Sequence, residues 1–132
     1  MSVGLLLITH GQIGSALLES ATSILGICPL NTECLSVAPY SEPQQISDQA
    51  RGVLRQIDQG SGALVLTDLF GSTPSNIACS LYHPGQVRVI AGVNLPMLIK
   101  IFNYARLDLD ALVDKALAGG CRGVMEYQPD GQ

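Results

Sequence analysis

Four short, nearly unbroken apolar runs alternate along the chain with segments whose apolar residues recur at helical spacing. The runs are VGLLLIT at 3–9, ECLSVA at 33–38, GALVLT at 62–67 and VRVIA at 87–91. Short apolar runs without strict alternation are typical of strands that are buried on both faces of a parallel sheet. We therefore predict a strand over each of these four ranges.

The segments between the runs have the pattern of amphipathic helices, with glycine or proline close to their ends. In the turn FGSTPSN, we expect Thr73 to be the N-cap of a short helix and Pro74 its first residue. The predicted helices cover 43–57, with Pro43 in the first turn, and 13–25, 74–81, 96–104 and 109–118, the last of them ending before Gly119 and Gly120.

Strands that alternate with helices predict an α/β domain with a mainly parallel sheet. Right-handed crossovers favour a small doubly wound sheet with its four strands in the order 2-1-3-4. In this order the carboxyl ends of the first and third strands flank the switch point, where such sheets bind ligands. His10 ends the first strand and Asp68 follows the third, so we expect the two side chains to meet in a crevice. A final edge strand is expected within RGVMEYQ, at 122–128.

The composition limits the class of protein. A length of 132 residues corresponds to one domain, and the chain is 47% apolar but only 14% charged, so we expect a second subunit to cover part of its surface. The net charge of −4 and the absence of a basic run argue against a nucleic-acid partner. The first apolar run is too short for a signal sequence or a membrane span, which predicts a cytoplasmic protein.

The remaining cysteine and histidine residues indicate no metal site and no cofactor. Cys28, Cys34, Cys79 and Cys121 form no CxxC pair, and no histidine stands at metal-ligand spacing from them. We expect the cysteines to be small buried apolar residues in a reducing compartment. The second histidine, His83, precedes a proline at a helix end, and we expect it to be structural.

The polar residues at the predicted crevice suit transfer of a phosphoryl group. A neutral imidazole is a nucleophile, and a carboxylate on one ring nitrogen fixes the tautomer and stabilises the positive charge that develops, which is the role expected for Asp68. The helix start after Asp68 offers an anion site of free N–H groups and hydroxyls. Gly11 lets a phosphate or a partner backbone approach His10. The expected phosphate-binding residues are therefore Gly11, Gly71, Ser72 and Thr73.

Three linked motifs carry a family resemblance. They are GLLLITHGQIGSALLESA at the start, DLFGSTPSNIA in the middle and GVNLPML at 92–98. With these motifs the chain resembles enzyme IIA of the mannose family of the bacterial phosphoenolpyruvate-dependent sugar phosphotransferase system. The resemblance runs from the first strand to about Tyr127 and implies a family domain over 1–128 with a flexible tail at 129–132.

The resemblance implies a phosphotransferase activity for the chain. His10 would accept a phosphoryl group from the phosphocarrier protein HPr and pass it to a histidine of a IIB protein, for sugar transport or a regulatory phosphorelay. Because the chain ends soon after the last predicted strand, we expect the IIB protein to be separate and the membrane to be reached only through permease subunits.

The family pattern also implies residue roles and an assembly. Asp68 matches the aspartate that hydrogen-bonds the active histidine, and Thr73 stands where the family usually has serine. The resemblance further implies a homodimer in which the last strand, 123–128, is antiparallel and exchanged between subunits. A loop lining the same crevice corresponds to Asn94, Leu95 and Pro96.

The sequence departs from the family pattern at one position and is compatible with more than one function. Ser72 replaces the second glycine of the family motif, which puts the rate of transfer in question rather than the identity of the protein. A regulatory module that reads the state of His10 without onward transfer has the same sequence features. Three further functions match parts of the sequence: a small tetrapyrrole metal chelatase, the IIA-like subunit of the dihydroxyacetone kinase system, and a hydrolase triad of Ser72 or Ser75 with His10 and Asp68.

Overall fold

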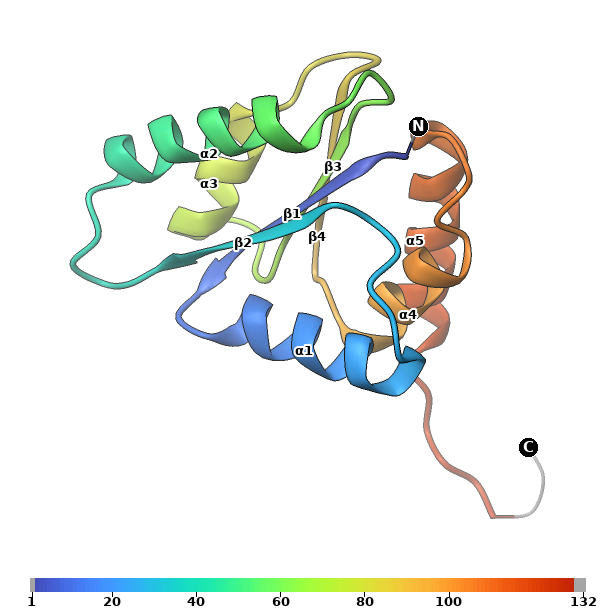
Figure 1. The fold of residues 1–132 in the computed structure, drawn as a ribbon. Helices are drawn as coiled ribbons and strands as arrows, with labels where there is room; N and C mark the ends of the chain where they lie inside the picture. The colour runs from blue at the N-terminus through green and yellow to red at the C-terminus, as the bar shows by residue number, and fades with distance from the viewer. Residues whose placement is uncertain (1, 130–132) are drawn as a thin grey trace.

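Within residues 2–129, which the computed structural model describes, parallel strands form a single central sheet (Figure 1). The order β2-β1-β3-β4 is the one predicted from the sequence, and every neighbouring pair is parallel. The predicted strand positions are confirmed to within a few residues at each end. The strands are β1 (Gly4–His10), β2 (Thr32–Val37), β3 (Ala63–Thr67) and β4 (Val87–Ala91).

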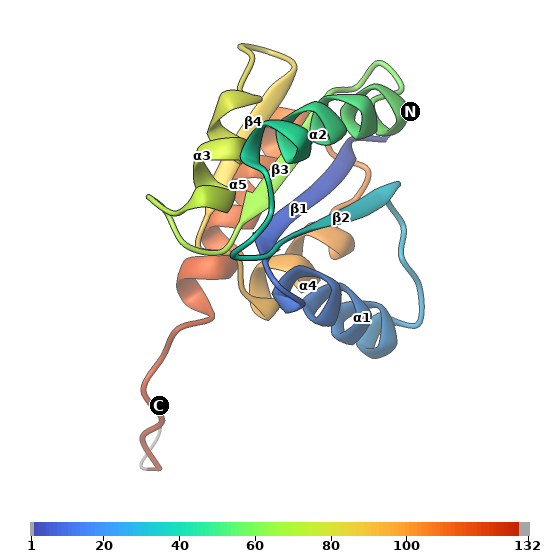
Figure 2. The same cartoon turned by 90° about the vertical axis from the view of Figure 1, so that its left-hand side faces the viewer.

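Helices cover both faces of the sheet, and this explains the apolar runs. Leu5 and Leu7 of β1 pack in the core on one face, whereas Leu6 and Ile8 pack in the core on the other, and all of them are 0% exposed. A strand buried in this way cannot alternate apolar and polar residues. Figures 1 and 2 show the two layers: α1 (Ile13–Leu25), α4 (Leu95–Asn103) and α5 (Leu109–Arg122) on one face, α2 (Pro43–Ile57) and α3 (Thr73–Ser80) on the other.

The last helix was predicted to end before Gly119 and Gly120, but this pair of glycines lies inside α5. The two glycines face α4 at close range. A Cβ on Gly119 would lie 2.5 Å from Cβ of Lys100, and a Cβ on Gly120 would lie 2.7 Å from Cε of Met97. The glycines therefore allow α5 to pack tightly against α4, and this contact outweighs their low helix propensity.

The segment after α5 forms no strand within the described residues. Residues 123–128 leave the helix and run away from the body of the molecule (Figure 1). Val124, Met125 and Tyr127 are 78%, 81% and 83% exposed. The edge strand predicted at 122–128 is thus not seen here, and residues 130–132 of the predicted tail lie outside the described residues.

The prediction that the cysteines are buried is wrong. Cys28, Cys79 and Cys121 are exposed free thiols, because they lie in a loop, on α3 and in the last turn of α5, where they do not reach the core. Only Cys34 is half-buried, and this burial raises the pKa of its thiol to about 11. In the part of the chain that the structure describes, no helix has both the length and the apolar character needed to cross a membrane.

Candidate functional site

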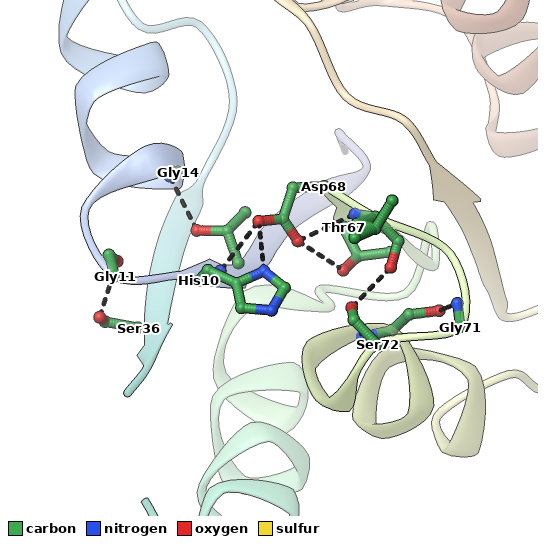
Figure 3. Close-up of polar contacts among 11 residues, drawn as sticks. His10, Gly11, Gly14, Ser36, Thr67, Asp68, Gly71 and Ser72 are labelled. Carbon is green, nitrogen blue, oxygen red and sulfur yellow. Dashed lines mark hydrogen bonds and ion pairs between the residues drawn. The ribbon is translucent and has the colours of Figure 1, made fainter. Parts of the chain in front are cut away.

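His10 and Asp68 meet at the carboxyl edge of the sheet, as the sequence predicts. His10 is the last residue of β1, Asp68 directly follows β3, and the register that pairs Ile8 with Thr67 brings their side chains together. Oδ2 of Asp68 lies 2.8 Å from Nδ1 of the His10 ring and accepts the His10 backbone N–H at 3.0 Å (Figure 3). An ionised carboxylate only accepts hydrogen bonds, so Nδ1 carries the proton and Nε2 has the free lone pair.

Asp68 is held as an anion at this position. Its side chain is 11% exposed, and its other oxygen, Oδ1, accepts the N–H of Leu69 at 3.0 Å. Burial by itself raises the pKa of this carboxyl. Hydrogen bonds outweigh this burial: the carboxylate accepts from the backbone and the ring of His10 and from the backbone of Asp68 itself. Together with the charge of His10, they lower the pKa of Asp68 below its ordinary value. The carboxylate is therefore ionised throughout the neutral range.

The second ring nitrogen of His10 is accessible. The side chain is 48% exposed, and Figure 3 shows Nε2 turned away from Asp68. His10 lines a groove of about 630 Å³. The groove is mostly apolar and is bounded by the turn after β1, by the end of β2 with the β2–α2 connection, and by the start of α3. Its other lining residues are Gly11, Val37, Ala38, Pro39, Ser41, Pro43, Thr73 and Pro74.

The turn after His10 is fixed by strand β2. Gly11 has a φ of +46°, which favours glycine, and no atom lies within 4 Å of where its Cβ would be, so the space beside His10 is open. Its N–H donates to the carbonyl of Val37 at 3.1 Å, and its carbonyl accepts the hydroxyl of Ser36 at 2.7 Å. Ser36 was not expected at the site from the sequence. The signal for it was the predicted pairing of the first two strands, because Ser36 lies opposite Thr9 at the end of that pair.

The start of α3 differs from the prediction by one residue. Ser72, not Thr73, is the N-cap, and its hydroxyl accepts the N–H of Ser75 at 3.5 Å and donates to the carbonyl of Leu69 at 2.5 Å. The N–H of Gly71 donates to Oγ of Ser75 at 3.2 Å. The donors of Gly71 and Ser72 are thus used within the loop. Thr73 is instead the first residue of the helix, and its N–H has no partner among residues 2–129.

Asn94, Leu95 and Pro96 do not line the groove that contains His10. Asn94 is the N-cap of α4: its side chain accepts the N–H of Met97 at 2.9 Å and donates to the carbonyl of Gly120 at 3.1 Å. Leu95 and Pro96 line a separate hollow between α4 and α5. The structure therefore gives this loop a role in joining the two helices.

The geometry separates the other residues considered from His10. His83 lines a different groove, so it does not face His10 as a second ligand of a metal-inserting site. Ser72 and Ser75 are engaged within their own loop, and no hydrogen bond joins either of them to His10 in the described chain. Among those residues, no group of three or more His, Cys, Asp and Glu side chains is arranged to hold a metal ion.

The site can therefore act as a nucleophile at one nitrogen. The Asp68 carboxylate holds Nδ1 and balances positive charge on the ring, while Nε2 is open to the groove. The N-terminus of α3, with the unpaired N–H of Thr73, lines the same groove and favours an anion there. The combination suits the acceptance of a transferable anionic group.

Comparison with known proteins gives a consistent result. The family profile EIIA-man, described as the PTS system fructose IIA component, matches residues 4–117. The mannose-specific EIIAB component of the PTS from Escherichia coli K12 is 31% identical over 128 residues, which cover 94% of this chain and 39% of that protein. The chain thus spans about two fifths of the length of that relative.

A shorter relative and a solved structure are also similar. The sorbose-specific EIIA component of the PTS from Lacticaseibacillus casei is 30% identical over 100 residues, 74% of this chain and 70% of that protein. The mannose/sorbose specific IIA subunit of the phosphotransferase system from Enterococcus faecalis superposes with a TM-score of 0.84 at 26% identity. That match covers 100% of this chain and 99% of the other.

Proposed function

Because the chain belongs to the mannose-type IIA family of the phosphotransferase system, we propose that it is a cytoplasmic phosphoryl carrier whose acceptor atom is Nε2 of His10. The observation that carries this assignment is the 2.8 Å contact between Nδ1 of His10 and Asp68, which leaves Nε2 as the free nitrogen. We assign the family domain to residues 1–128.

The transfer step uses few groups. The lone pair of Nε2 attacks the phosphorus of a phosphohistidine on the donor, the bond from phosphorus to the donor nitrogen breaks, and that nitrogen leaves with the bonding pair. The proton on Nδ1 stays in place, so the phosphorylated ring carries positive charge. Asp68 stabilises this charge and keeps the ring oriented. In the reverse direction the same arrangement releases the phosphoryl group to an acceptor histidine.

The groove supplies contacts for the phosphoryl oxygens. Thr73 offers an unpaired N–H and a hydroxyl at the positive end of α3, and the open space at Gly11 admits the group. Gly71 and Ser72 support this site by holding the loop, because their donors already have partners there. Thr73 is thus the proposed direct contact, and Gly71 and Ser72 are the residues that position it.

The proposed partners are the phosphocarrier protein HPr as donor and a IIB protein as acceptor, each through a histidine. A protein partner needs contact area around Nε2, and the loop after Asp68 offers Leu69 and Phe70, which are 63% and 76% exposed. Large exposed apolar side chains beside a reactive group are typical of a docking surface.

A homodimer completes the proposal. We propose that residues 123–128 add to the sheet of a second copy as an antiparallel edge strand. Within the described chain this segment forms neither helix nor strand, and its large apolar side chains are exposed. Pairing with another chain would bury them and satisfy their backbone groups.

The test is phosphorylation in a reconstituted relay. The chain is incubated with labelled phosphoenolpyruvate, enzyme I and HPr, and we expect an acid-labile, base-stable label that is lost in His10→Ala and kept in the matched control His83→Ala. Addition of a IIB protein should discharge the label, which separates a carrier from a sensor. Full labelling of His10→Ala would refute the assignment.

A further inference from the structure

A second groove lies at the opposite edge of the sheet from His10. It has a volume of about 590 Å³ and lies between the C-terminal half of α2 and the loop that joins α3 to β4. Figure 1 shows this loop beside the end of α2 at the top of the molecule. Val87, which lines the groove, is the first residue of β4, whereas His10 is the last residue of β1. In a parallel sheet all strands begin at one end of the sheet and finish at the other, so these two positions lie at opposite ends and the two grooves are separate.

Cationic side chains from α2 converge on this groove. Arg51 and Arg55 are one helical turn apart on α2 and both line it. Arg55 has no hydrogen bond or ion pair among residues 2–129, and Arg51 makes only a 3.8 Å contact with Asp48, an exposed residue. Such loosely held guanidinium groups are free to form paired hydrogen bonds with an anion.

The carboxylate in the groove, Asp58, is not paired with either guanidinium group. Oδ1 of Asp58 accepts the N–H groups of Gly60 and Gly62 at 2.9 and 3.0 Å, so this carboxylate is committed to the turn after α2. No ion pair joins it to Arg51 or Arg55 within the described residues. Two arginines thus face one aspartate among the residues that line the groove, and their guanidinium donors stay available for an anion.

The opposite wall presents a fixed imidazole. His83 and Val87 exchange backbone hydrogen bonds at 3.1 and 2.9 Å and close a tight turn through Pro84 and Gly85. The ring Nδ1 lies 3.2 Å from the Pro84 carbonyl, which can only accept, so Nδ1 carries the proton and Nε2 is free. The floor between the two walls is apolar: Leu54, Leu81 and Val87.

We propose that this groove binds a small phosphomonoester as its monoanion: Arg51 and Arg55 hold the phosphate oxygens, Nε2 of His83 accepts the P–OH hydrogen bond, and the organic part lies over the apolar floor. A phosphomonoester monoanion offers oxygens to the guanidinium groups on one wall and a P–OH donor to the imidazole on the other, whereas a carboxylate offers no donor. A few polar groups around an apolar base are typical of small-molecule sites. The proposal goes beyond the relay function and does not depend on His10.

The test is a titration of the ¹⁵N-labelled full chain with inorganic phosphate and with phenyl phosphate at constant ionic strength. We expect saturable shifts of the amide resonances at 51–58 and 81–87 and tighter binding of phenyl phosphate, because its ring covers the apolar floor. Arg51→Gln and Arg55→Gln should each weaken binding by roughly tenfold, the effect of one charged hydrogen bond. The control Arg106→Gln removes the same charge elsewhere and should leave binding unchanged.

Several results would overturn the proposal. Shifts that do not saturate, or that potassium chloride reproduces, would mean general charge screening. Equal binding of benzoate would exclude a phosphate site. Shifts confined to residues near Thr73 that persist in Arg55→Gln would place the anion only at the relay site. Because Arg55 is exposed and distant from His10, phosphorylation by HPr should be normal in the variant, so the two functions are tested independently.

Discussion

His10 donates both its backbone N–H and its ring Nδ1–H to one oxygen of Asp68, at 3.0 and 2.8 Å. The two donors belong to the same residue, so the carboxylate fixes the ring relative to its own backbone. The Asp68 side chain cannot turn away without losing both bonds at once. This relationship makes Asp68 a positioning residue for the ring as well as a counter-charge.

The loss of this carboxylate should slow phosphoryl transfer without preventing attachment. In Asp68→Ala the nucleophile Nε2 remains, but the ring is free to rotate and its developing charge is uncompensated. We expect the rate of phosphorylation by HPr to fall by about 10²-fold, the usual lower range for a group that assists a reacting imidazole. Asp68→Asn, which keeps the shape but not the charge, should fall between the native chain and Asp68→Ala. Rapid-quench labelling measures all three, and an unchanged rate in Asp68→Ala would remove Asp68 from the mechanism.

The stability of the fold should depend on Asp68 in acid. Its pKa in the folded protein lies below the ordinary value of 3.8, so the unfolded chain binds this proton more tightly. The stabilisation is therefore complete above pH 3.8 and is lost as the pH falls through the folded-state pKa. We expect the excess free energy of unfolding of the native chain over Asp68→Asn to decrease below that pH in urea titrations. An excess that grows on acidification would contradict the lowered pKa.

Sequence patterns predicted the sheet and the His10–Asp68 pair because both follow from simple rules. Each buried strand ends where its apolar run ends, and parallel order brings the ends of β1 and β3 together. The N-cap of α3 was misplaced because Ser72 and Thr73 both carry a suitable hydroxyl and Pro74 is tolerated at either of the first helical positions. Only the contact of Ser72 with Leu69 decides between them.

Long-range packing explains the other differences. Gly119 and Gly120 have the local signature of a helix end, but their contact with α4 keeps them within α5. Asn94 was expected beside His10, yet it bonds to the carbonyl of Gly120, 26 residues away. Neither contact is visible from local spacing. The family resemblance identified the motif but did not reveal what its side chains touch in this chain.

Substitutions at Ser72 should separate helix capping from catalysis. Ser72→Ala loses both side-chain hydrogen bonds of the N-cap and should cost about 1 kcal/mol in the free energy of unfolding, whereas Ser72→Gly, the family residue, should cost only a few tenths. Because the hydroxyl is already committed to the loop, phosphoryl transfer should be nearly unchanged in both. Thr73→Ala, the matched change in the groove, should slow transfer roughly tenfold or more with little loss of stability. Urea denaturation and labelling rates report the two effects separately, and a slow Ser72→Gly with a fast Thr73→Ala would reverse the assignment.

The segment after α5 should hold the dimer together through one of its faces. If 123–128 forms a strand in a second copy, Met125 and Tyr127 point to the same side of the sheet and Glu126 to the other, because side chains alternate along a strand. Met125 and Tyr127 are 81% and 83% exposed in the single chain, so burial of both supplies several kcal/mol of association energy. The double variant Met125→Asp, Tyr127→Asp should therefore be monomeric in analytical ultracentrifugation, whereas the control Glu126→Gln should remain dimeric. Since His10 and Asp68 come from one chain, the monomer should still accept label from HPr. A double variant that stays dimeric would place the interface elsewhere on the molecule.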